Sequence, residues 1–153
     1  MKIFRAVCCT FAIILLIVAY SVSMKLIKDE DFIGTYYSVN IKSDIMLEIC
    51  GTTTGIIDKI EDENIVSYVD SMTVTDDAIY GICKKKYFLL TLSDKKVVYS
   101  STPMAQYAKC SLLSPMEYYE KKTKYLDLIG GIILLGCIIF IIKIGFFHVS
   151  KTK

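Results

Sequence analysis

The hydrophobic residues of this chain are concentrated in two long runs, one near each end. The first run, Ala6–Met24, contains no charged residue and would measure about 28 Å as a helix, close to the thickness of a bilayer's hydrocarbon core. The second run begins at Leu128, is uncharged as far as Ile142, and continues past Lys143 to Val149. This pattern predicts a transmembrane helix over residues 128–149, followed by a cytoplasmic tail over residues 150–153.

The first run also has the features of a secretory signal peptide. Two basic residues precede it, and small residues stand near its end at Ala19, Ser21 and Ser23. Cleavage after Ser21 or Ser23 would leave a mature protein with one span, whereas retention would make the segment a membrane anchor. Residues 1–23 are therefore predicted to be a signal peptide or a signal anchor, and both alternatives stay open.

The sidedness of the chain rests on this signal-like start. The basic residues that flank the two runs are too evenly distributed to decide the topology by themselves. A signal sequence directs export of the residues that follow it. We therefore expect an extracytoplasmic middle region attached to a plasma membrane or a bacterial inner membrane.

The middle of the chain alternates short apolar runs with polar turns, which is typical of antiparallel strands. Within one such run Phe88, Leu90 and Leu92 fall on a single face, which we assign to the core. The clearest strand candidates are 78–83, 87–92, 97–100 and 65–69, and the weaker ones are 35–39, 45–49 and 56–60. The expected fold class is membrane-anchored α+β, with residues 24–113 forming a small antiparallel β-sheet or partly open barrel of about six or seven short strands.

Two helix starts follow the predicted strands. Thr102 before Pro103 predicts a short helix that ends near Ser111. Ser114 and Glu117 have the spacing of a capping box, in which each residue satisfies a backbone N–H of the other. No helix-breaking residue follows before the second apolar run, so residues 114–127 are predicted to be a helical stalk continuous with the transmembrane helix.

Composition and charge narrow the classes of function. The chain has 153 residues, 54% of them hydrophobic, and a formal net charge of +2, which provides no basic field for nucleic-acid binding. The single histidine, His148, lies at the predicted cytoplasmic end of the second span, so the exported region has no His-based triad or zinc site. Carboxylates cluster at 29–31, 61–63 and 76–77, all in predicted turns or beside the membrane, where solvated charge is expected. We therefore expect no enzyme activity, no metal and no cofactor.

Three of the six cysteines, Cys50, Cys83 and Cys110, fall in the middle region. Their wide spacing excludes a Cys-x-x-Cys redox motif and a compact zinc knuckle. Because two thiols should pair in an oxidising compartment, we expect a disulfide between Cys83 and Cys110. The alternative is that all three are buried reduced thiols that act as small apolar residues.

Lys84, Lys85 and Lys86 form the one dense basic site, between two predicted strands. As a solvated turn they would discourage edge-to-edge strand pairing. As a functional site they would contact an anionic partner or a lipid headgroup.

The size and architecture favour a small binding module that contacts membrane lipid and a protein partner of unknown identity. An immunity, exclusion or accessory-subunit protein would fit this description. A structural membrane protein of a virus or a cell envelope is the alternative, and an exported hydrolase that uses carboxylates is the third hypothesis.

Overall fold

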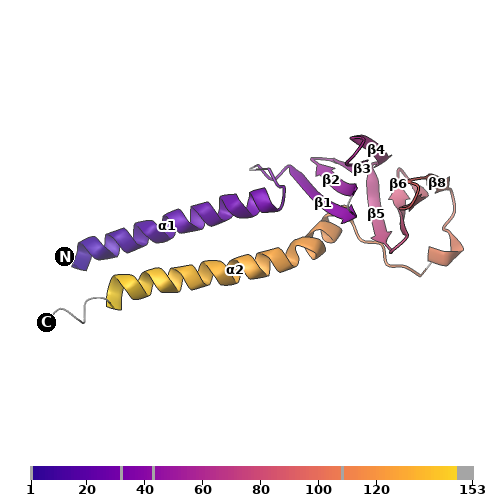
Figure 1. The fold of residues 1–153 in the computed structure, drawn as a ribbon. Helices are drawn as coiled ribbons and strands as arrows, with labels where there is room; N and C mark the ends of the chain where they lie inside the picture. The colour runs from indigo at the N-terminus through magenta and orange to yellow at the C-terminus, as the bar shows by residue number, and fades with distance from the viewer. Residues whose placement is uncertain (1, 32, 43, 108, 148–153) are drawn as a thin grey trace. The chain divides into compact units, whose positions relative to one another are not determined.

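The structure is a computed structural model that describes residues 2–31, 33–42, 44–107 and 109–147. An apolar helix, α1 (Lys2–Ile27), precedes eight strands, and a long helix, α2 (Pro115–Phe147), follows them (Figure 1). The chain divides into two compact units. One contains Lys28–Lys122 and is called the strand unit; the other contains the residues on either side of it and is called the helical unit.

The fold class predicted from the sequence is confirmed. An apolar N-terminal helix, antiparallel sheets and a long apolar C-terminal helix are all present, and the predicted stalk is continuous with that last helix. Two helical stretches, Ile3–Ile27 and Pro115–Gly145, are long and apolar enough to cross a membrane. The end of the predicted span at Val149 lies outside the described residues.

The strand unit contains two four-stranded antiparallel meanders. The first sheet is β1 (Tyr36–Lys42), β2 (Ile45–Cys50), β3 (Thr53–Asp58) and β4 (Glu63–Ser67), paired in that order. The second sheet is β5 (Val69–Val74), β6 (Ala78–Cys83), β7 (Lys86–Thr91) and β8 (Val97–Ser100), also in chain order.

The two sheets explain why the structure has eight strands instead of six or seven. The sequence pattern merged residues 65–69 into one strand, but the backbone turns at Tyr68, whose φ is +59°. This residue separates β4 from β5 and moves the chain from one sheet to the other. The left-handed conformation of a tyrosine leaves no signal in the sequence pattern.

The helix expected from Thr102 to about Ser111 is absent from the described residues of that segment, which contain only the 3-10 turn η1 (Ala105–Tyr107). A helix of this length gains too few hydrogen bonds to offset its nucleation cost. Packing instead holds the segment: the Tyr107 ring stacks on Tyr80, with 4.7 Å between centroids.

The strand register defines two ends of the strand unit. The residues aligned at the first end are Tyr36, Cys50, Thr53, Val69, Cys83 and Lys86. The aligned residues of the two sheets belong to the same end, because the Tyr68 N–H, just before β5, donates to the Thr54 carbonyl of β3. The chain enters and leaves the unit beside β1, where Glu30 bridges to Tyr37 and the Tyr37 and Tyr119 rings meet edge to face at 5.4 Å. We call this first end, where the chain enters and leaves, the proximal end of the strand unit, and the opposite end the distal end.

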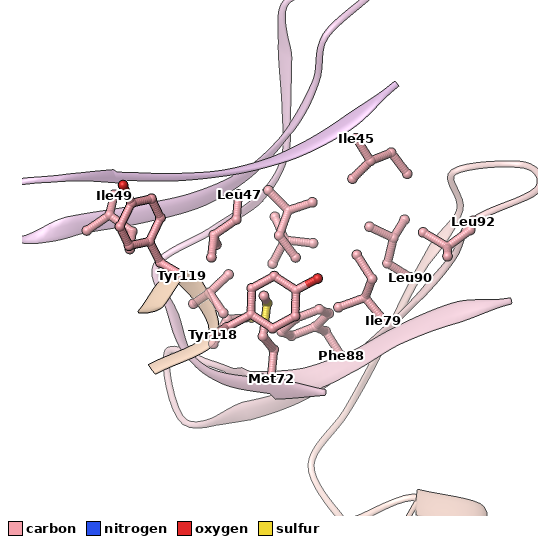
Figure 2. Close-up of a cluster of buried hydrophobic side chains, with 14 residues drawn as sticks. Ile45, Leu47, Ile49, Met72, Ile79, Phe88, Leu90, Leu92, Tyr118 and Tyr119 are labelled. Atoms are coloured by element: carbon pink, nitrogen blue, oxygen red, sulfur yellow. The ribbon is translucent and has the colours of Figure 1, made fainter. Parts of the chain in front are cut away.

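The core lies between the two sheets and is closed by the first turns of α2 (Figure 2). Inward residues alternate along the strands, as in β2, and Phe88, Leu90 and Leu92 are buried as predicted. Tyr118 and Tyr119 of α2 add two buried aromatic rings. Burying a large apolar side chain contributes about 1.5–3 kcal/mol, so this core is the main source of stability of the unit.

The predicted capping box at the start of α2 is confirmed. The Ser114 N–H donates to Glu117 Oε2 at 2.7 Å, and the Glu117 N–H donates to the Ser114 hydroxyl at 3.3 Å. Pro115 occupies the first helical position, where its missing N–H costs nothing. The helix therefore begins at a fixed residue beside the second sheet, where Leu113 bridges to Met72.

In the helical unit, α1 and α2 approach each other closely at two glycines of α2. A Cβ atom at Gly130 would lie 2.8 Å from the Tyr20 hydroxyl and 2.9 Å from the Met24 sulfur, and one at Gly145 would overlap Cys9. Small residues at such positions allow two membrane helices to pack backbone to backbone.

Candidate functional site

The predicted basic turn is a two-residue hairpin turn at the proximal end. Cys83 and Lys86 form the last pair of β6 and β7, so Lys84 and Lys85 alone make the connection. Their φ angles are +47° and +65°, the pattern of a type I′ turn. Glycine and asparagine are favoured at these positions, and lysine is strained there. The sequence at this turn is thus not the one that stability alone would select.

Lys84 is held over an aromatic ring. Its ammonium nitrogen lies 4.0 Å from the centroid of Tyr68, the residue that links the two sheets. Such a cation–π contact orients the side chain while leaving its N–H groups available to other acceptors. All three lysines of the turn are exposed.

A hollow of about 350 Å³ lies next to this turn. It is lined by Ile65 and Ser67 of β4, Cys83, Lys84 and Lys86 of the β6–β7 hairpin, and Tyr99 of β8. Gly81, Phe88 and Tyr99 are directly opposite one another in the register and therefore share the core-facing side of the sheet. Tyr99 is nevertheless 52% exposed. The hollow is thus the open side of the sandwich, between the edges of the two sheets.

The other two sheet edges are partly covered. The Asp31 N–H donates to the Tyr36 carbonyl at the edge of β1, and Leu113 exchanges two backbone hydrogen bonds with Met72 of β5. Within the described residues, β4 and β8 each pair with a single strand. The hollow is therefore flanked by β4 and β8, the two sheet edges that have no additional β-bridge among the described residues.

A second hollow of about 240 Å³ borders the first. It lies on the outer face of the first sheet, where Glu48, Gly55 and Ser67 are aligned across three strands. Its lining residues are Glu48, Cys50, Thr53, Thr54, Gly55, Asn64, Ser67 and Tyr68. Ser67 lines both hollows. The second hollow is polar, and the absence of a side chain at Gly55 leaves room for the Asn64 amide, which would lie 3.0 Å from a Cβ there.

The groups in the first hollow are poorly suited to covalent chemistry. Burial, helped by the negative charge of Asp70, raises the pKa of the Cys83 thiol, although Lys84 and Lys86 oppose the shift. Burial likewise raises the pKa of Tyr99. A thiol with a raised pKa carries little nucleophilic thiolate at neutral pH. The Cys83 thiol and the Tyr99 hydroxyl are therefore weak nucleophiles at neutral pH.

The predicted disulfide partners occupy different environments. Cys83 is buried at the end of β6, Cys110 is exposed after η1, and both are free thiols in the structure. The pairing of Cys83 with Cys110 stays a prediction.

The carboxylates of 29–31 have local partners. Thr35 donates two hydrogen bonds to Asp31 and holds the pKa of that carboxyl at about 2. Glu30 accepts from the Tyr119 hydroxyl at 2.5 Å, and Asp29 accepts from Ser38. The acids at 61–63 and 76–77 are exposed at the distal end, in turns or, for Glu63, at the start of β4. No three His, Cys, Asp or Glu side chains among the described residues could together hold a metal ion, and His148 lies outside those residues.

Sequence reasoning located the basic turn but missed its surroundings. Tyr68 precedes the lysines by a whole hairpin, yet its ring lies under Lys84. Tyr99 is separated from them by β7, and the register brings it to the first hollow with Lys84 and Lys86. The available signal in the sequence was the apolar run of Val97, Val98 and Tyr99 in a short last strand, because an edge of this kind is normally protected.

No family model, no curated protein and no solved structure matches the chain.

Proposed function

We propose that the chain is a small membrane-tethered module that binds a protein partner and performs no catalysis. The observation that carries the proposal is the open side of the strand unit, where two unprotected strand edges flank a hollow of about 350 Å³. Val98 and Tyr99 are 56% and 52% exposed on one of these edges. Exposed, strand-forming edges of this kind are the surfaces to which an extended segment of another protein adds as a further strand.

The backbone of β8 offers a specific place for such a strand. The Thr91 N–H donates to the Lys96 carbonyl, and antiparallel hydrogen bonds recur at every second residue pair. Lys96, Val98 and Ser100 therefore bond to β7, whereas the backbone groups of Val97 and Tyr99 point away from the sheet. A partner strand would bond to Val97 and Tyr99 and would place side chains over the hollow beside Cys83.

The tether in this proposal is formed by the apolar helices. Residues 128–149 span a plasma membrane or a bacterial inner membrane, and residues 114–127 form the stalk. Residues 24–113 form the binding domain on the extracytoplasmic side. We propose that the first segment is retained as an anchor, since α1 packs on α2 at Gly130 and Gly145. An epitope tag placed before residue 2 that stays on the full-length membrane protein supports retention, and its loss shows cleavage.

A photo-crosslinking experiment tests the binding site. A photoreactive phenylalanine replaces Val98 in the full chain, expressed in the membranes of its own host, and Ile60 is the control because it is 77% exposed at the distal end. We expect a specific adduct from position 98 and none from position 60.

Two substitutions of one residue separate the backbone from the side chain. Tyr99→Pro removes the outward N–H without breaking the β7–β8 ladder, because proline is tolerated where an edge N–H faces solvent. Tyr99→Ala removes the same ring but keeps the N–H. Strand addition requires Tyr99→Pro to abolish the adduct and Tyr99→Ala to retain much of it. Equal adducts in the two variants would contradict the proposal.

A further inference from the structure

The charged residues of the strand unit are unevenly distributed between its two ends. The acids in the distal turns and at their flanking strand ends are Asp44, Asp58, Glu61, Asp62, Glu63, Asp76, Asp77 and Asp94. The lysines of the same regions are Lys42, Lys59, Lys95 and Lys96. That all of them belong to one end is shown by Lys95, which bonds to both Asp44 and Asp58, and by Lys42, which donates to the Asp76 carbonyl. The distal end is therefore acidic.

The lysine turn belongs to the opposite end. Cys83 and Lys86 pair in line with Val69, and the Val69 carbonyl accepts from the Thr54 hydroxyl at 2.6 Å. This connection places Lys84 and Lys85 at the proximal end, where the chain enters beside Tyr37 and leaves through α2. Glu48 lines the second hollow, and the charge of Asp70 acts on Cys83. The acids Asp29, Glu30 and Asp31 also belong to this end, where they accept hydrogen bonds from Ser38, Tyr119 and Thr35.

Chain length alone keeps this end close to the apolar segments. Lys28 directly follows the last residue of α1. Residues 123–127 separate the strand unit from Leu128, and even fully extended they reach only about 22 Å. In the tethered protein of our proposed function, the proximal end thus cannot move far from the bilayer surface.

The chemistry of the turn fits an anionic surface. Each lysine offers three N–H donors and a positive charge that suit a phosphodiester, and the exposed ring of Tyr68, which lies under Lys84, suits the headgroup region. Both turn lysines occupy strained left-handed conformations in which glycine or asparagine would be more stable. A binding role would account for lysine at these positions, since strained residues gather at functional sites.

We infer that the turn formed by Lys84, Lys85 and Lys86 binds the phosphate groups of anionic phospholipids on the membrane that tethers the chain. The inference rests on the proposed membrane attachment and adds a second contact between protein and bilayer. It orients the strand unit with its acidic distal end away from the lipid and leaves the β8 edge for the protein partner.

Hydrogen exchange on the full chain in nanodiscs tests the inference. Discs of phosphatidylcholine are compared with discs of phosphatidylcholine and phosphatidylglycerol, and the amides of residues 83–87 are followed by mass spectrometry. We expect several-fold slower exchange at these amides in the anionic discs, reversed by high salt, and no difference at residues 93–96. Phosphatidylcholine discs with soluble glycerophosphate should behave like phosphatidylcholine discs alone, because the ligand is the lipid surface.

The key variant is Lys84→Asn with Lys85→Gly, which installs the preferred type I′ turn residues. It should fold at least as stably as the wild type and lose the slowing in anionic discs. The matched control is Lys59→Ala with Lys96→Ala, which removes two exposed lysines of the distal end and should keep the slowing.

Each outcome decides the inference. Equal exchange in both kinds of disc, or equal slowing in the wild type and the turn variant, overturns it and leaves the lysines as a solvated turn or as contacts for the protein partner. Protection by glycerophosphate alone shows a soluble phosphate ligand and also overturns it. A chain that fails to enter nanodiscs would instead contradict the membrane attachment of the proposed function.

Discussion

The Lys95 ammonium nitrogen lies 2.6 Å from Asp58 Oδ2, an ion pair that joins the loop between β7 and β8 to the end of β3. Asp44 Oδ2 lies 2.9 Å from the same nitrogen. Asp58 is 5% exposed and also accepts from the Ile60 N–H at 2.9 Å. One lysine thus connects the two sheets at the distal end of the strand unit.

Replacing this lysine should destabilise the strand unit. Lys95→Met leaves the buried Asp58 carboxylate without its cation, and an uncompensated buried charge is costly. We expect the thermal midpoint of the full chain in detergent, followed by near-ultraviolet circular dichroism of the tyrosines, to fall by several degrees. Lys96→Met is the control, because Lys96 has an 80% exposed side chain and a 3.5 Å pair with Asp94. Equal midpoints for the two variants would show that the connection contributes nothing.

The same ion pair predicts an acid-labile fold. The hydrogen bond from Lys95, followed by the Ile60 N–H, lowers the pKa of Asp58. A carboxyl whose pKa is lower in the folded state adds stability above its unfolded pKa and loses it as the pH falls through the folded value. Stability should therefore decline below about pH 4. The pKa of Lys95 is raised, mainly by Asp58, so stability should also decline above about pH 10.

Thermal midpoints measured across this pH range for the wild type and Asp58→Asn provide the check. The difference between the two proteins should shrink toward low pH, where the wild-type carboxyl is also neutral. A difference that stays constant with pH would show that Asp58 stabilises the fold by packing alone.

The capping box at the start of α2 should contribute about as much to the free energy of unfolding as one helix cap usually does. Ser114→Ala removes the hydroxyl that accepts from the Glu117 N–H and should lower the free energy of unfolding by about 1 kcal/mol. Ser111→Ala, outside the helix, is the control and should have little effect. Urea unfolding of the full chain in detergent measures both, and a Ser114→Ala variant as stable as the wild type would contradict the prediction.

The parts of the fold that the sequence predicted are those governed by local chemistry. Ser114 and Glu117 satisfy each other within one turn, and Phe88, Leu90 and Leu92 alternate because a strand has a period of two. The boundary at Tyr68 could not be predicted, since it depends on a left-handed residue that the two sheets jointly impose. The prediction of a helix after Thr102 was wrong, because a favourable cap cannot offset the nucleation cost of so short a helix.

The candidate site, too, could be predicted from the sequence only in part. The three lysines are adjacent in the chain and were visible as a basic turn. Their position at the proximal end depends on the register that aligns Cys83 with Val69 and on the contact of Tyr68 with Thr54. Both connect residues of different strands, and neither has a signature in a single sequence.

Gly81 should not tolerate a side chain. A Cβ atom there would lie 2.7 Å from the Phe88 ring and would also overlap the Ser71 carbonyl oxygen, so neither neighbour can move without disturbing the sheet. Gly81→Ala should cost about 1–3 kcal/mol of unfolding free energy, the usual penalty of overpacking a core. Gly136→Ala is the control, because a Cβ at Gly136 would meet no atom of another described segment within 4 Å. A Gly81→Ala variant as stable as the wild type would contradict the close contact between Gly81 and the Phe88 ring.

Two adjacent tyrosines of α2 should respond differently to loss of the hydroxyl. The Tyr119 hydroxyl donates to Glu30 Oε1 at 2.5 Å and so ties the outgoing helix to the incoming chain at the proximal end. The Tyr118 hydroxyl is buried and has no hydrogen-bond partner among the described residues. Because a hydrogen bond to a charged group contributes about 1.5–3 kcal/mol, Tyr119→Phe should destabilise the full chain by an amount in this range.

Tyr118→Phe is the matched control for this last prediction. It removes a buried hydroxyl that makes no hydrogen bond within the described part of the chain, so the free energy of unfolding should stay unchanged or rise. Hydrogen exchange at residues 28–31 adds a local readout: Tyr119→Phe should speed exchange there because the incoming segment loses its attachment, and Tyr118→Phe should not. If both variants lose stability equally, the rings alone hold α2 to the sheets, and the proximal end is closed by packing instead of by the bond between Tyr119 and Glu30.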